Sequence, residues 1–68
     1  METVWLVFDH QPYYDGGESL MSVHASLEGA KEYLQDFFRK RGLEIDPELE
    51  DYDNGNYDLR ITEWQVEP

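Results

Sequence analysis

One segment of the chain, residues 27 to 41, has an apolar stripe at helical spacing, and the need to bury that stripe constrains the fold most. A helix with a single apolar stripe must pack it against another layer of secondary structure. The other apolar segments have strand-like patterns, so we expect this layer to be a β-sheet. The stripe consists of Leu27, Ala30, Leu34, Phe37 and Phe38.

Both ends of this segment have helix-terminating signals. Ser26 precedes the stripe and is predicted to be the N-cap, and Glu28 lies in the first turn, where a carboxylate favours the helix dipole. Three basic residues, 39 to 41, form the last turn, and Gly42 follows them as a left-handed cap. We therefore predict a helix from Leu27 to Arg41.

Two strands are predicted before the helix. Residues 3 to 9, TVWLVFD, are β-branched and aromatic, with apolar side chains in both alternating sets, which is typical of a central strand. The stretch from Gln11 to Glu18 contains Pro, Asp and two Gly residues and is predicted to be a connecting loop. Ser19 to Ala25 is predicted to be the second strand, and the short loop favours an antiparallel hairpin.

The last strand is predicted from Tyr57 to Val66, and its apolar pattern changes phase. Tyr57, Leu59 and Ile61 share one face, whereas Trp64 and Val66 fall on the other. Either a bulge lies near Thr62 and Glu63, or the strand has apolar residues on both faces. Because the first and last strands are the most apolar, we expect them to be neighbours in the middle of the sheet. Trp5 and Trp64 are then expected on the face that the helix leaves uncovered.

Between the helix and the last strand, residues 43 to 58 contain seven acidic residues and no basic one. This stretch is either a long loop or includes an edge strand over Glu48 to Asp53, followed by Asn54-Gly55 as a type I′ hairpin turn. Asn-Gly is a strong hairpin signal, so we favour the strand. The expected fold is α+β: a single domain, residues 1–68, with an antiparallel sheet of three to four strands in the order β-β-α-(β)-β and one helix packed on one face.

Size and charge narrow the classes of function. A chain of 68 residues without cysteine has no disulfide and little volume for a deep substrate pocket, so we do not expect an enzyme or a bound cofactor. The net charge of −11 disfavours direct binding to nucleic-acid phosphates and favours a basic partner. The N-terminus lacks a basic targeting segment, and the longest apolar run is far below the roughly 20 residues that cross a bilayer, so we expect a cytoplasmic protein with no membrane partner.

The chain resembles a group of small uncharacterised proteins of bacteria and their phages. The resemblance spans nearly the whole chain apart from the acidic stretch, and it implies a ββαβ-type domain that a phage could encode. The resemblance implies no activity, and the motifs that carry it are structural. They are Val4-Trp5-Leu6-Val7, Tyr14-Asp15-Gly16, Val23-His24-Ala25-Ser26, Ala30 and Tyr33 in the helix, and Ile61-Thr62-Glu63-Trp64-Gln65-Val66.

Three candidate chemical sites each have a simpler explanation. His10 and His24 end the two strands of the predicted hairpin, at opposite ends, so they do not form one site. An EF-hand loop starting at Asp51 would need acidic residues or Gly at positions where this chain has other residues, and no second helix follows. Asp15 and Glu18 flank two glycines, but a chain with 16 Asp and Glu residues is expected to contain such pairs by chance. No catalytic, metal or cofactor-binding residues are predicted.

The leading hypothesis is an interaction protein whose acidic face occupies a basic surface of a partner protein. If that partner binds nucleic acid, the carboxylates replace phosphates, and the protein acts as a nucleic-acid mimic or as a phage-encoded inhibitor of a host nucleic-acid-binding or defence protein. The alternative is a homo-oligomeric structural or accessory module with an exposed Trp and Tyr face, since aromatic residues such as Tyr13 and Tyr14 exceed what one core needs. The predicted partner-binding residues are Glu44, Asp46, Glu48, Glu50, Asp51, Asp53, Asp58, Tyr52 and Tyr57.

Overall fold

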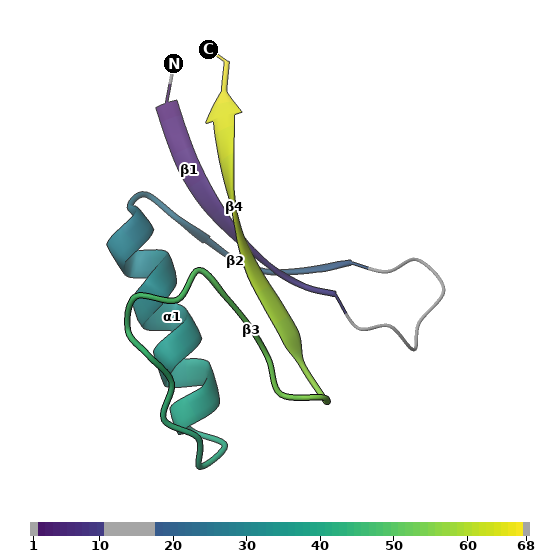
Figure 1. The fold of residues 1–68 in the computed structure, drawn as a ribbon. Helices are drawn as coiled ribbons and strands as arrows, with labels where there is room; N and C mark the ends of the chain where they lie inside the picture. The colour runs from purple at the N-terminus through teal and green to yellow at the C-terminus, as the bar shows by residue number, and fades with distance from the viewer. Residues whose placement is uncertain (1, 11–17, 68) are drawn as a thin grey trace.

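In the computed structural model, the described residues are 2–10 and 18–67, and they form a four-stranded antiparallel sheet with one helix against it (Figure 1). The elements are β1 (Glu2–Asp9), β2 (Ser19–His24), α1 (Leu27–Arg39), β3 (Asp51–Asp53) and β4 (Asp58–Val66). The strand order is β2-β1-β4-β3. The predicted fold class and element order are therefore confirmed. The predicted connecting loop lies outside the described residues apart from Glu18, as do Tyr13 and Tyr14.

The central pair of the sheet is β1 and β4, as the apolar patterns predicted. Their register runs without interruption from Glu2 opposite Val66 to Asp9 opposite Leu59. Of the two alternatives for the phase change, the bulge near residues 62 and 63 is therefore wrong, and the second is confirmed: β4 has apolar residues on both faces. The register irregularity lies on the other side of β1, in its pairing with β2 between Val7 and Phe8.

Strand alternation decides which residues meet the helix. Val7 and Leu59 are fully buried on the helix side. Trp5 is two residues from Val7, so it shares that side, and it packs against the core. Trp64 lies on the opposite side and is 58% exposed. The prediction that both tryptophans lie on the face that the helix leaves uncovered is thus confirmed for Trp64 and wrong for Trp5.

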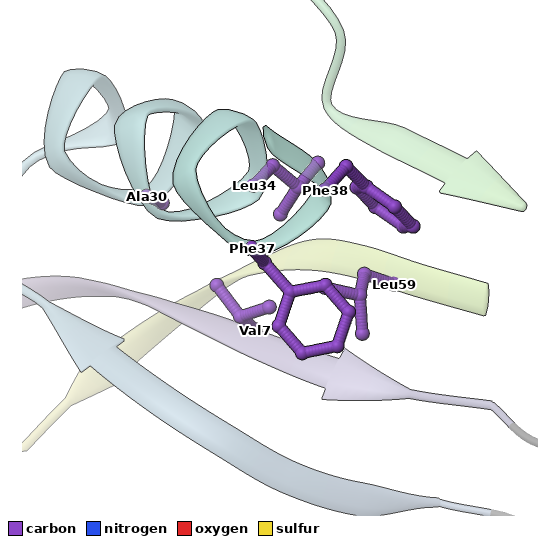
Figure 2. Close-up of a cluster of buried hydrophobic side chains, with 6 residues drawn as sticks. All are labelled: Val7, Ala30, Leu34, Phe37, Phe38 and Leu59. Carbon is purple, nitrogen blue, oxygen red and sulfur yellow. The ribbon is translucent and has the colours of Figure 1, made fainter. Parts of the chain in front are cut away.

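The core is a small cluster between α1 and the central strands. The ring of Phe37 extends from the helix toward Val7 and Leu59, while Phe38 lies on the side of β3 (Figure 2). Two tyrosine rings extend this cluster: Tyr52 lies 5.0 Å from Phe38 and Tyr57 lies 5.1 Å from Phe37, between centroids. The buried apolar residues are Val7, Ala30, Leu34, Phe37, Phe38 and Leu59.

The helix begins after Ser26 as predicted, and it ends in a capping turn around Gly42. The side chain of Ser26 accepts a hydrogen bond from the Gly29 N–H at 3.1 Å. At the other end the Leu43 N–H donates to the Phe38 carbonyl at 2.9 Å, and the Gly42 N–H donates to Arg39 at 2.9 Å. These two bonds form a Schellman motif around Gly42, whose φ is +81°. Regular helix thus ends at Arg39, two residues before the predicted Arg41, because the capping turn occupies the last two positions.

Replacing Ser26 with Ala should lower the melting temperature. An N-cap Ser→Ala change costs about 1 kcal/mol, which corresponds to about 4–8 °C in a domain of this size. Thermal unfolding followed by circular dichroism measures the effect. Ser26→Asp is the matched control, because it keeps an acceptor for the Gly29 N–H and should melt close to the parent. Equal melting of Ser26→Ala and the parent would show that the hydrogen bond contributes nothing to stability.

The acidic stretch contains a shorter edge strand than predicted. Only Asp51–Asp53 pairs with β4, whereas the prediction began at Glu48. The Asn54-Gly55 turn is not type I′, which needs positive φ at both residues: Gly55 has φ +92°, but no described non-glycine residue has a positive φ. Residues 54 to 57 form a four-residue connection instead, in which Asn54 Oδ1 accepts the Tyr57 N–H at 2.8 Å.

Candidate interaction surface

The structure divides the predicted acidic face into two groups, and the first lies beside the helix. Glu44 Oε1 is 3.3 Å from Arg39 Nε, and Glu48 Oε2 is 3.5 Å from Lys31 Nζ. Asp46 accepts the Glu48 N–H at 2.9 Å and so shapes the local turn. All three acidic side chains are exposed, so these ion pairs contribute little to stability. Their positions next to helix cations reduce the negative field on this side.

The second group lies on the opposite side of the sheet, where β3 meets β4. Asp53 is directly opposite Asp58 in the ladder, and Asp51 is directly opposite Arg60. Alternation along the strands places these four side chains on the face away from α1. We call Asp51, Asp53 and Asp58 the acidic rim. It gathers three carboxylates around a single guanidinium.

The guanidinium of Arg60 is the one cation in this cluster. Its Nη2 is 3.0 Å from Asp58 Oδ2. The hydrogen bonds that Arg60 donates to Asp58, then the charge of Asp58, and then the charges of Asp51 and Asp53 raise the pKa of Arg60 above its ordinary value. Arg60 is therefore positively charged at any ordinary pH, and one positive charge is left among three negative ones.

The remaining predicted partner-binding residues take other positions. Glu50 is exposed, and its carbonyl accepts the Ile61 N–H at 2.9 Å. Tyr52 and Tyr57 are half-buried on the helix side, where their rings contact Phe38 and Phe37. The structure thus separates these two tyrosines from the acidic rim, because they alternate with the rim residues along β3 and into β4.

Next to the acidic rim lies an apolar surface that no described element covers. The helix and the segment that follows it both lie on the other side of the sheet (Figure 1). The exposed fractions on this surface include 55% for Leu20, 55% for Val23 and 58% for Trp64. We call this surface the bare sheet face. Its apolar residues are Val4, Leu6, Phe8, Leu20, Val23, Trp64 and Val66.

The sequence pattern did not reveal that these two features lie on the same face. An acidic segment and an exposed aromatic face were predicted as separate alternatives. The register of β3 against β4 places them on the same side of the sheet, since Asp58 and Trp64 are an even number of residues apart. The even spacing of residues 58, 60, 62, 64 and 66 was a usable signal, but it holds only for a strand without a bulge near Thr62 and Glu63, and the pattern left both alternatives open.

One close pair of polar side chains was also missed. Ser22 Oγ and His24 Nε2 are 2.7 Å apart on the helix side of β2, which is the separation of a nucleophile and its base. The other contact of the His24 ring is with Tyr33, at 5.5 Å between centroids. Among the described residues no carboxylate is hydrogen-bonded to His24, so the third member that would orient the ring is missing from this part of the chain. The pair fits a structural role beneath α1.

Other concave or ligand-rich positions are occupied by internal contacts. A hollow near the end of α1 is bordered by Arg41. The Arg41 guanidinium is already engaged within the chain: it lies 3.6 Å from the centroid of the Phe37 ring and donates a hydrogen bond to the Phe37 carbonyl at 2.8 Å. His10 Nδ1 is 3.5 Å from Glu18 Oε1, and it is on a different strand end from His24.

In residues 2–10 and 18–67 no three His, Asp or Glu side chains are grouped so that they could hold a metal ion. Within the same residues, no helix has the length and apolarity needed to cross a membrane.

Comparison with protein-family models gives no match to this chain, and neither the curated proteins nor the solved structures give one. The functional inference therefore rests on the residues and their geometry.

Proposed function

We propose that this protein is a non-enzymatic interaction protein that binds a basic surface of a partner protein through its carboxylates. The observation that carries the proposal is the acidic rim, where Asp53 lies directly opposite Asp58 and Asp51 is on the same face. Like charges directly opposite each other destabilise a sheet. A partner that supplies Lys or Arg side chains would relieve this repulsion, so binding energy is available at this position.

A nucleic-acid-binding partner is the special case. Its basic surface is built to contact phosphates, and charge-assisted hydrogen bonds from Arg and Lys serve carboxylates as well as phosphates. The protein would then compete with nucleic acid for that surface. A phage-encoded inhibitor of a host nucleic-acid-binding or defence protein is one biological form that this activity would take.

The second candidate function is a homo-oligomeric accessory module. The observation that favours it is the bare sheet face, where Trp64 and Val66 are exposed. Isolated apolar residues on a surface are ordinary, but a contiguous patch marks an interaction site. The oligomeric state in solution separates this candidate from the first.

Added salt should act with opposite sign on folding and on binding. Between about 0.1 M and about 1 M NaCl the Debye length falls from about 10 Å to about 3 Å. Screening reduces the repulsion among the carboxylates, so the urea midpoint of unfolding should rise. The same screening should release a basic partner that the immobilised protein captures from a bacterial lysate, and about 0.5 M NaCl should already elute it.

The captured proteins are identified by mass spectrometry, and duplex DNA is then added as a competitor. Displacement of the partner by DNA would support the nucleic-acid mimic specifically. A partner that remains bound at high salt, or a captured set without basic proteins, would contradict charge-driven recognition.

A further inference from the structure

The bare sheet face has the dimensions of a single helix. The eight residues of β1 span about 26 Å. Because β2 pairs with β1 only from Trp5 to Asp9, the strip is three strands and about 15 Å wide over that part, and it narrows to β1 and β4, about 10 Å wide, toward Glu2. A helix is about 10 Å in diameter and rises about 1.5 Å per residue, so about 17 residues would cover the strip. On the opposite face, the 13 residues of α1 pack around Val7 and Leu59, while Glu63 and Gln65 on that face are exposed.

The negative charges at one edge of this strip determine which side chains its occupant must carry there. At the Phe8 end of the strip the apolar residues adjoin the acidic rim, on the side of β3, whereas Trp64 and Val66 lie toward the other end of β4. Among the described strand residues that point to this side, Arg60 is the only basic one, and it is already paired with Asp58. An occupant that reaches the rim must therefore supply its own Lys or Arg side chains there.

A second copy of this chain does not meet that requirement. The apolar strip measures about 400 Å² in projection, about half of the roughly 800 Å² that each side of a stable interface buries. A dimer would therefore have to extend over the acidic rim as well. Each rim would then face either the other rim or the apolar edge at β2, where Leu20 and Val23 point outward. Neither arrangement supplies a positive charge other than Arg60, which is already paired with Asp58.

The geometry points to an amphipathic helix of a partner protein as the occupant of the bare sheet face, with apolar residues on one side and Lys or Arg along the flank that meets the acidic rim. This inference rests on the proposed function. It specifies that the basic surface of the partner is a helix and that the helix also has an apolar side. The bound helix would make a three-layer arrangement, with α1 on one side of the sheet and the partner helix on the other.

The test uses a defined probe, a fluorescently labelled synthetic peptide of about 17 residues. It contains only Leu and Lys, with Leu at positions i, i+3, i+4 and i+7 so that it forms a basic amphipathic helix. A scrambled peptide of the same composition keeps the charge and removes the apolar stripe. Fluorescence anisotropy measures both affinities. The amphipathic peptide should bind at least tenfold more tightly than the scrambled one.

Variants of the protein locate the binding site. Val23→Thr with Trp64→Thr removes exposed apolar surface with β-compatible residues, and it should weaken binding of the amphipathic peptide at least tenfold. Asp51→Asn with Asp53→Asn removes two rim charges and keeps an acceptor for the Gly55 N–H, which Asp53 Oδ1 accepts at 2.8 Å. It should weaken binding several-fold.

Glu28→Gln with Glu32→Gln makes the same change of charge on the exposed side of α1, as the matched control. It should change the affinity less than twofold. Circular dichroism establishes that each variant is folded. In a Trp5→Phe background, the emission of Trp64 should shift to shorter wavelength when the peptide binds, because its ring then leaves water.

Three results would overturn the inference, and they differ in what they say of the proposed function. Equal binding of both peptides, with no loss in the Thr variant, would remove the helix site and leave recognition by charge standing. No binding of either peptide would contradict both. A stable dimer in sedimentation equilibrium that the Thr variant dissociates would assign the bare sheet face to a second copy of the chain.

Discussion

Phe37→Ala should leave the protein largely unfolded at about 37 °C. Phe37 is 8% exposed and contacts the rings of Tyr33, Phe38 and Tyr57. Truncation of a core phenylalanine costs about 3–5 kcal/mol. A domain of this size has a total stability of about the same amount, because its core is small and no disulfide supports it. The loss therefore removes most of the folding free energy.

Amide dispersion in a two-dimensional NMR spectrum measures the outcome. Phe37→Leu is the first control, since it keeps most of the apolar volume and should remain folded. Leu20→Ala is the second, because Leu20 is 55% exposed on the bare sheet face and its truncation should change stability by about 0.5 kcal/mol or less. A dispersed spectrum for Phe37→Ala at that temperature would show that the ring is dispensable and that the rest of the cluster holds the fold.

Reversing four charges of the acidic stretch should abolish capture of a basic partner and leave the fold intact. The change replaces Glu48, Glu50, Asp51 and Asp53 with Lys. Each side chain is exposed and none belongs to the core, so the cost is confined to the weak Glu48–Lys31 pair, the turn hydrogen bond of Asp53, and repulsion between Arg60 and the reversed charges at positions 51 and 53. Each replacement removes one negative charge and adds one positive charge, so the four together change the net charge from −11 to −3.

A control variant with the same net charge separates position from total charge. Glu32, Asp36, Glu63 and Glu67 are also exposed, and they lie outside the acidic rim and the loop before β3. Their replacement with Lys should preserve capture. Equal loss in both variants would mean that only total charge matters. Undiminished capture by the first variant would mean that the acidic stretch only solubilises the protein, and the bare sheet face would then be the better candidate for the interface.

The local features of the fold could be predicted from the sequence because neighbours in the chain determine them. The cap at Ser26, the left-handed Gly42 and the apolar stripe of α1 each involve residues within one or two turns of each other. The central position of β1 and β4 was also predictable, since they are the two most apolar strand segments of the chain and strands with apolar residues in both alternating sets favour the middle of a sheet.

The side of the sheet that each residue faces was not predictable in the same way. Alternation places Trp5 with Val7, but both sets of β1 are apolar, so the pattern alone does not say which set meets the helix. The choice depends on which strand residues leave room for Phe37 and Phe38, which is a property of the packed layers. Trp5 was assigned to the wrong side for this reason.

The sequence by itself determined that this chain forms one capped helix, a sheet with an apolar centre and an acidic stretch before its last strand, because each of these follows from residue type and local spacing. Only the tertiary structure decided that three of the seven acidic residues in that stretch lie on the same side of the sheet as Trp64. That placement depends on the register of β3 against β4 and of β4 against β1. Cross-strand hydrogen bonds set this register between segments far apart in the chain, and a shift of one residue would have moved the same carboxylates to the side of α1.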